Sequence, residues 1–116
     1  YGKYLDELIY MPIVAINKSE DIDILKGHIS ANRCAFELTF REEPIYMIQA
    51  ADLLKGTSRI WVNCLWDTLC GGHEDDQALL DPEAHYGYLI NTLGASIIQT
   101  DRPEFLISYL KAHNLH

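Results

Sequence analysis

The chain has 116 residues, a length typical of one domain, and 48% of them are hydrophobic, as in globular proteins. It contains no apolar run long enough to cross a membrane as a helix. Its formal net charge of −8 argues against nucleic acid as a partner, because binding to phosphate backbones depends on basic surfaces.

The first predicted unit is a strand over residues 9–16 followed by a helix. The run is continuously apolar, as expected for a strand covered on both faces, although Pro12 removes one ladder donor and favours an edge or bulged position. Residues 17–19 then form a turn, and Ser19 is the expected N-cap. The helical stripe consists of Ile22, Leu25 and Ile29.

The second unit begins with a strand over residues 34–40 that carries Glu37 inside it. Alternation puts Glu37 on a small and polar face with Ala35 and Thr39, opposite an apolar face. A loop over residues 41–43 leads to Pro44, which suits the first turn of a helix. The buried stripe of that helix is Met47, Ala50, Ala51 and Leu54, and Gly56 ends it.

The third unit starts at Arg59 with a strand over residues 60–66, in which Trp61 and Asn63 share a face. A long loop over residues 67–80 follows and contains Gly71-Gly72-His73-Glu74-Asp75-Asp76. Asp81-Pro82-Glu83 is a strong helix start. The expected buried stripe of this helix is Tyr86, Leu89, Ile90 and Leu93, with Gly94 as its stop.

The fourth unit is a short strand over residues 95–99, the polar pair Thr100-Asp101, and a helix that begins at Pro103. The inward residues of this helix are Leu106, Tyr109 and Leu110. Four consecutive βα units predict an α/β fold with a parallel sheet and right-handed crossovers, in one domain over residues 1–116. Ligands of such folds bind at the carboxyl ends of the strands, where the polar pair lies.

Two stretches of the sequence resemble glycerophosphodiester phosphodiesterases, a family of (β/α)8-barrel enzymes. Residues 97–103, Ile-Ile-Gln-Thr-Asp-Arg-Pro, are similar to the family's strand eight and the start of helix eight. Residues 59–63 are similar to its strand-seven Trp/Asn motif, but Trp61 and Asn63 stand one residue closer together than in the family pattern. Met11-Pro12 and Phe36-Glu37 would then belong to strands five and six. The resemblance thus implies the C-terminal half of a TIM-type barrel.

The resemblance implies an intact enzyme that hydrolyses glycerophosphodiesters to an alcohol and glycerol 3-phosphate, with Mg²⁺ or Ca²⁺ as cofactor. The family's catalytic histidines and metal-binding carboxylates lie in a His-Arg-Gly type motif and a Glu-x-Asp motif, and this sequence contains neither. We therefore assign no catalytic or metal-binding residue and expect the chain to be inactive alone. The missing N-terminal half, or a second copy of the chain, is expected to cover the open sheet edges.

Substrate contacts are expected first along the strands. A carboxylate within an apolar strand is costly unless it is paired or faces a polar centre, so Glu37 either lines the active site or pairs with a nearby cation. The candidate cations are Lys18, Arg41 and Arg59. Trp61 either forms an apolar wall for the glycerol or alcohol moiety or packs in the core. Asn63 would bond hydroxyl groups or a water that a ligand holds.

Further contacts are expected at the carboxyl ends of the strands. His73 and the neighbouring glycine amides would contact substrate, unless residues 74–76 form a solvated acidic loop that caps the next helix. Thr100 and Asp101 lie at the mouth, where Asp101 either contacts substrate or accepts bonds from the amides that begin the last helix.

Three further points follow from the sequence. The alternative function is a non-catalytic binding or scaffold module that keeps the half-barrel fold. The compartment is left open, because the family includes cytoplasmic, secreted and periplasmic enzymes. Three cysteines, Cys34, Cys64 and Cys70, follow no zinc-binding spacing and are too few for a disulfide framework, so the two in strand-like runs are expected to be buried thiols.

Overall fold

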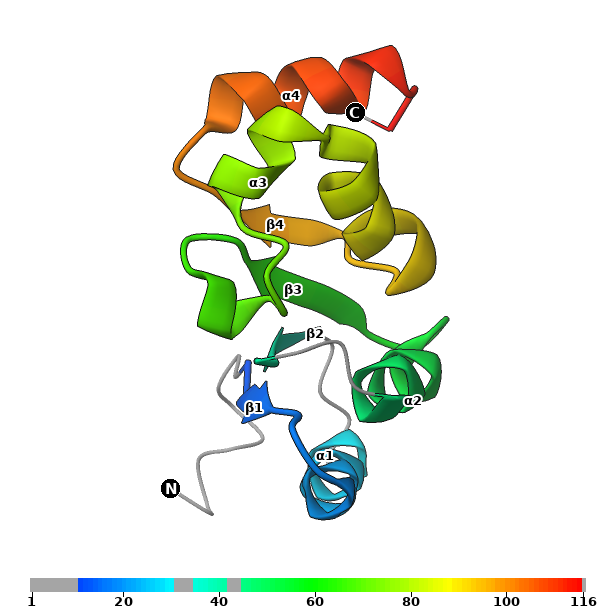
Figure 1. Cartoon of the computed structure of the whole chain (residues 1–116). Helices are drawn as coiled ribbons and strands as arrows, with labels where there is room; N and C mark the ends of the chain where they lie inside the picture. The colour runs from blue at the N-terminus through cyan, green and yellow to red at the C-terminus, as the bar shows by residue number, and fades with distance from the viewer. Residues whose placement is uncertain (1–10, 31–34, 42–44, 116) are drawn as a thin grey trace.

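The computed structural model describes residues 11–30, 35–41 and 45–115 of the chain. Within these ranges, four strands form one sheet in the order β1-β2-β3-β4, and every neighbouring pair is parallel (Figure 1). The strands are β1 (Ile13–Ala15), β2 (Ala35–Thr39), β3 (Arg59–Asn63) and β4 (Ile97–Gln99). Each strand therefore pairs with the next one along the chain, which confirms the predicted α/β topology.

Helices connect the strands. They are α1 (Ser19–Ile29), α2 (Ile45–Leu54), the 3₁₀ helix η2 (Asp67–Leu69), α3 (Asp75–Leu80), the π-helix η3 (Glu83–Thr92) and α4 (Pro103–Ala112). α1 packs against β1 and α2, whereas α4 lies beside η3 at the other end of the molecule (Figure 1). None of the helices in the described ranges combines the length and apolarity needed to cross a bilayer.

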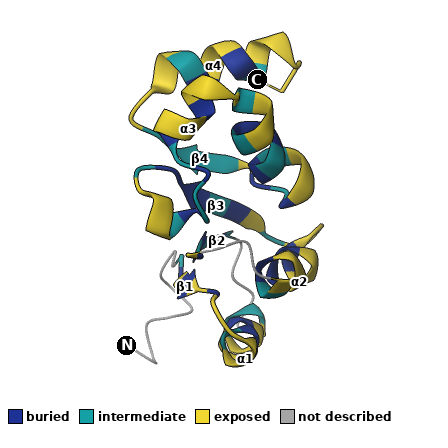
Figure 2. Cartoon of the chain, viewed as in Figure 1, coloured by how far each residue is buried: buried dark blue, intermediate teal, exposed yellow. Residues whose placement is uncertain are grey.

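The two faces of the sheet differ sharply in burial, as the dark blue segments of the strands in Figure 2 indicate. On one face every side chain of β1, β2 and β3 is at most 4% exposed, because the helices cover it. These side chains are Val14, Phe36, Leu38, Ile60 and Val62. The opposite face carries Ile13, which is 66% exposed, and the half-buried Glu37 and Trp61. We call this second surface the open face.

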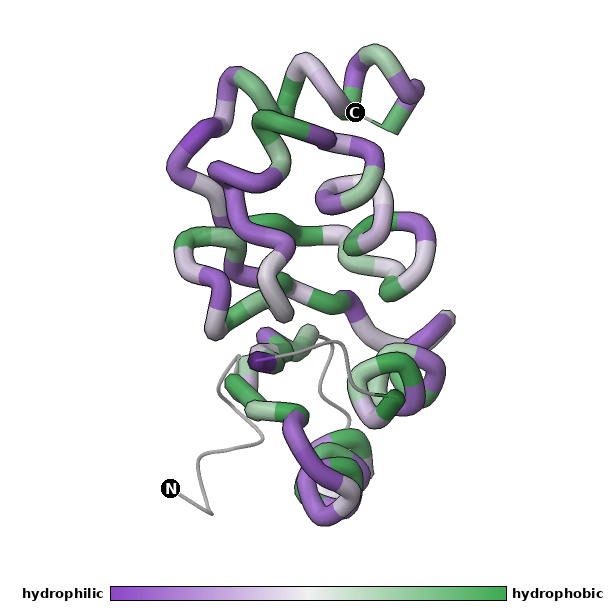
Figure 3. The backbone as a smooth tube through the Cα atoms, viewed as in Figure 1, coloured by the Kyte–Doolittle hydropathy of each residue, from purple (hydrophilic) through white to green (hydrophobic). Residues whose placement is uncertain are grey.

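Local sequence explains how the helices begin and end. The predicted stripe of α2 is buried throughout, in a segment that is largely green in Figure 3. Gly56 follows the helix with φ of +78°, a conformation that favours glycine. At α1 the N-cap is Lys18 rather than the predicted Ser19. The reason is Asp21, whose Oδ2 accepts bonds from the backbone amides of Asn17 at 2.8 Å and Lys18 at 3.0 Å.

The segment after β3 departs most from the prediction. Residues 67–80, expected to be a long loop, contain η2 and α3, separated by a turn in which Gly71 and Gly72 have φ of 61° and 84°. The next helix is a π-helix, and it ends with a bond from the Leu93 amide to the carbonyl of Tyr88, five residues earlier. The apolar residues of this segment have α-helical spacing, and such spacing does not predict the wider turns of a π-helix.

The strands are shorter than the apolar runs that predicted them, since the first run spanned residues 9–16 and β1 covers only three residues. The predicted strand position of residues 9–10 and Cys34, and the helical turn at Pro44, fall outside the described residues. At the C-terminal end α4 begins at Pro103, as predicted, and buries Leu106 and Tyr109.

Candidate functional site

The open face aligns one residue from each strand in a row. The register pairs Ile13 with Glu37, Glu37 with Trp61, and Trp61 with Ile97. Asn63 lies two residues beyond Trp61 on the same face, because alternate residues of a strand share a face. The structure therefore brings together three of the predicted substrate residues, namely Glu37, Trp61 and Asn63, on a surface that the helices leave open.

Hydrogen bonds orient one of these side chains and leave another unsatisfied. The Asn63 Nδ2 donates to Gln99 Oε1 at 3.1 Å, and its Oδ1 accepts from the Leu65 amide at 3.0 Å. By contrast, the indole Nε1 of Trp61 is buried and has no hydrogen-bond partner among the described residues. Buried donors in native proteins are nearly always paired, so this N–H is the group on the open face that would gain most from a partner.

Asp75 is the centre of a buried polar cluster at the carboxyl ends of β3 and β4. It is 5% exposed and stands at the start of α3. Its Oδ1 accepts bonds from the Tyr86 hydroxyl at 2.5 Å and Thr100 Oγ1 at 2.6 Å, and its Oδ2 accepts from the Asp101 amide at 2.8 Å. Asp75 thus ties α3 to η3 and to the end of β4. The prediction of a solvated acidic loop was wrong for this residue, because these donors draw its carboxylate inward.

The predicted mouth residues Thr100 and Asp101 serve this cluster in different ways. Thr100 Oγ1 also accepts a bond from the Arg102 amide at 2.9 Å, whereas no side chain caps the N-terminus of α4. Asp101 joins the cluster through its backbone, and its side chain is exposed. Arg102 forms an exposed ion pair with Asp76 at 2.7 Å. A polar cleft opens here, lined by Leu65, Glu74, Asp75, Asp76, Asp101 and Arg102.

His73 lies away from the open face. It is 6% exposed, its ring stacks on that of Tyr88 at 4.4 Å between centroids, and its Nδ1 is 2.9 Å from the Nδ1 of His85. A contact between two ring nitrogens at this distance requires one to donate and the other to accept. His73 therefore braces the glycine turn against η3, and the structure does not bring it together with Glu37 and Trp61.

Sequence reasoning missed the partners that organise this region, which are Asp75, His85, Tyr86 and Tyr88. Tyr86 was interpreted only as part of the buried stripe of its helix. An acidic residue at the first position of a helix was the available signal for Asp75, but the helix itself had been predicted as loop.

Two tyrosines pack between η3, α4 and the polar cluster. Burial, followed by the bond to Asp75, raises the pKa of Tyr86. Burial, followed by the bond that its hydroxyl donates to Glu83 at 2.9 Å, raises the pKa of Tyr109 to about 12. In both cases the folded protein favours the neutral phenol over the phenolate.

These shifts predict a loss of stability in alkali. A raised pKa in the folded state contributes stability that is complete below the unfolded pKa of about 10 and is lost as pH rises towards the folded value. We expect the free energy of unfolding to fall between pH 10 and about 12, the pKa of Tyr109. Urea unfolding at a series of pH values measures this loss, and Tyr109→Phe should make it shallower. Equal slopes for the wild type and the variant would contradict the assignment.

Among the described residues, no three or more His, Cys, Asp or Glu side chains gather so as to hold a metal ion. The polar residues at the strand ends bond mainly to each other. Activity as an enzyme and a divalent cation as its cofactor both stay predictions from the family resemblance.

A protein family matches most of the chain. The model of the family DUF4996, described as a domain of unknown function, matches residues 10–110. No curated protein matches the chain. The matched range includes all four described strands together with the open face and the polar cluster around Asp75.

Proposed function

The chain belongs to the DUF4996 family, which is described as a domain of unknown function, so we propose an activity for it from its own residues. We propose that it forms the C-terminal half of a (β/α)8 barrel similar to the glycerophosphodiester phosphodiesterases. The complete enzyme would hydrolyse a glycerophosphodiester to an alcohol and glycerol 3-phosphate. The observation that carries the proposal is the split of the sheet into one helix-covered face and one open face that carries Glu37, Trp61 and Asn63.

The order of the strands supports a barrel over a doubly wound sheet. In a doubly wound sheet the strand order reverses and helices cover both faces. Here the order β1-β2-β3-β4 never reverses, and the buried apolar side chains of β1, β2 and β3 occupy one face only. In a (β/α)8 barrel the helices form an outer ring and the opposite face of every strand points to the interior. Glu37 and Trp61 would then be interior residues.

The free edge of β4 supports a continuing sheet. Ile98 is the register partner of Val62 and points to the same side, yet Val62 is fully buried and Ile98 only half-buried. An apolar groove runs beside this edge, lined by Ile90, Ala95, Ser96, Ile98, Leu106, Leu110 and Leu115. A further βα unit beyond β4 would cover both the half-buried side chain and the groove.

The chemistry divides between the two halves of such a barrel. Phosphodiester hydrolysis needs an acid, a base and neutralisation of the phosphoryl oxygens, and a divalent cation held by the first half would supply the neutralisation. In this half, Glu37 and Asn63 would bond the hydroxyl groups of glycerol, and the ring of Trp61 would form the apolar wall. Asp101 and Arg102 would lie at the mouth.

Glu37→Gln tests the role of the open face. In a longer protein that joins this chain to a first half-barrel, we expect the variant to lower kcat/KM for glycerophosphocholine at least about tenfold, through a lost charged hydrogen bond. Glu20→Gln, an exposed residue at the start of α1, is the matched control and should leave kcat/KM unchanged. Equal values of kcat/KM for the wild type and Glu37→Gln would mean that Glu37 does not contact the substrate.

The proposal as a whole is tested by comparing the two lengths of protein. With Mg²⁺ or Ca²⁺ added, the longer protein should release choline from glycerophosphocholine and the chain alone should release none. Hydrolysis by the chain alone would contradict the proposed division of the site, and a longer protein without hydrolysis would contradict the activity.

A binding or scaffold module is the second candidate. It is favoured by the way in which Asp75, Tyr86 and Thr100 satisfy each other's hydrogen bonds. For this function, calorimetry with the longer protein should detect binding of glycerol 3-phosphate, while the choline assay detects no turnover.

A further inference from the structure

Two thiols are buried together at the carboxyl end of β3. Cys64 and Cys70 are both fully buried, and both are free in the structure. Cys64 continues the line of β3, since its amide donates to the Gln99 carbonyl at 2.9 Å. Its carbonyl in turn accepts from the Asp75 amide at 3.0 Å, which fixes the backbone of Cys64 between β4 and α3.

The chain returns to this point after η2. The register of β2 and β3 ends at Glu37 and Trp61, and just beyond the end of β2 an isolated parallel bridge pairs Phe40 with Cys70. The Phe40 amide donates to the Leu69 carbonyl at 3.3 Å, and the Gly71 amide donates to the Phe40 carbonyl at 2.8 Å. Cys70 therefore fills the space between the diverging ends of β2 and β3, beside Cys64.

The side chains are neighbours as well as the backbones. The nearby thiol of Cys70, followed by burial, raises the pKa of Cys64. The Cys70 Sγ donates to the carbonyl of Trp66 at 3.3 Å. The fold thus holds two buried thiols side by side, across a loop of five residues, 65–69, in a chain whose third cysteine, Cys34, lies outside the described residues.

We propose that Cys64 and Cys70 are a disulfide-forming site, which closes residues 64–70 into a covalent ring. With a small-molecule disulfide such as oxidised glutathione as oxidant, one cysteine thiolate attacks the glutathione disulfide and releases one glutathione thiol. The second cysteine then attacks the mixed disulfide, which forms the Cys64–Cys70 bond and releases the second glutathione. Two cysteine thiols are oxidised and one glutathione disulfide is reduced to two thiols.

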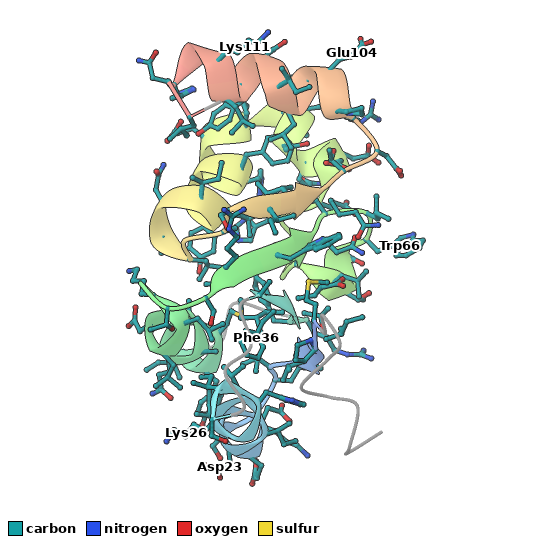
Figure 4. All side chains as sticks on the ribbon, turned by 180° about the vertical axis from the view of Figure 1, so that it is seen from behind. Asp23, Lys26, Phe36, Trp66, Glu104 and Lys111 are labelled. Atoms are coloured by element: carbon teal, nitrogen blue, oxygen red, sulfur yellow. The ribbon has the colours of Figure 1, made fainter. Side chains whose placement is uncertain are left out.

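The surroundings set when the bond forms. Only the thiolate attacks, and burial disfavours the thiolate of Cys64, so oxidation of the folded protein is slow. The disulfide should therefore form during folding, before β4 and α3 cover the pair. Once formed, it fixes the loop that carries Trp66, whose side chain points away from the protein (Figure 4) and is 62% exposed.

Thiol–disulfide equilibrium tests the proposal. The Cys34→Ser chain is equilibrated in glutathione redox buffers with and without denaturing urea. The oxidised fraction, which has lost two hydrogens, is measured by mass spectrometry. We expect the equilibrium constant for Cys64–Cys70 oxidation to be at least about tenfold higher without urea, because a fold that holds the thiols together favours the bond.

Two controls locate the bond. Peptide mapping should recover a linked Cys64–Cys70 fragment, and Cys70→Ser should give only mixed disulfides with glutathione. The proposal would be overturned if the equilibrium constant measured without urea were less than tenfold higher than the constant measured with urea. This holds whether the chain without urea is folded or unfolded. The test requires no enzymatic activity, so its outcome is independent of the proposed function.

Discussion

Asp75→Ala is expected to lower the free energy of unfolding by about 3–5 kcal/mol. The carboxylate of Asp75 is buried and accepts three hydrogen bonds, from Tyr86, Thr100 and the Asp101 amide. Alanine leaves these three donors without their acceptor. Urea unfolding followed by circular dichroism measures the change.

Two further variants distinguish the loss of the hydrogen bonds to Asp75 from a general effect of removing an acidic residue. Asp76→Ala removes the neighbouring carboxylate, which is exposed and paired with Arg102, and should change stability little. Tyr86→Phe in the Asp75→Ala background removes one hydroxyl that has lost its acceptor. The decrease in the free energy of unfolding in the double variant should therefore be smaller than the sum of the decreases in the single variants. Strict additivity would mean that Tyr86 and Asp75 do not act as a pair.

Phe36→Ala is expected to cost about 3–5 kcal/mol, whereas Ile13→Ser on the opposite face should cost no more than about 0.5 kcal/mol. Phe36 is fully buried on the helix-covered face of the sheet, while Ile13 is 66% exposed. Phe36→Ala thus opens a cavity in the core, and Ile13→Ser changes a side chain already in water. Unfolding midpoints of the two variants measure the contrast.

The same pair of variants tests the half-barrel in a longer protein. If a first half covers the open face and its edges, Ile13→Ser should become destabilising there, by about 1–3 kcal/mol, because the side chain is then buried. Phe36→Ala should cost about the same in both proteins. An Ile13→Ser variant that stays harmless in the longer protein would mean that the open face remains exposed.

Much of the fold follows from local patterns in the sequence. The alternation in residues 34–40 correctly divided Glu37 from Phe36, because a strand with one covered face keeps a period of two. The helical stripe of α2 and the Pro103 start of α4 were confirmed for a similar reason, since each depends on neighbours within one or two turns. Short-range periodicity therefore predicted the type of each of these elements and the face that it buries.

The site was predicted less completely, because its contacts join residues far apart in the sequence. Asp75 accepts hydrogen bonds from Thr100 and the Asp101 amide, about 25 residues away, and the sequence around Asp75 does not predict those partners. His73 was expected near substrate on the basis of its glycine turn, but its stacking on Tyr88 depends on the winding of η3. Trp61 and Asn63 were grouped correctly, since one strand carries both.

The pairing of each strand with its successor also bears on how the chain folds. Register partners such as Ile13 and Glu37, or Trp61 and Ile97, lie far apart in the sequence, and parallel pairing across such distances is slower than the formation of local contacts. Because each strand pairs with its successor, a nascent chain can still assemble this sheet strand by strand as it leaves the ribosome. Among the described strands β4 is added last, and its edge, with the half-buried Ile98, is open to aggregation until another strand docks on it.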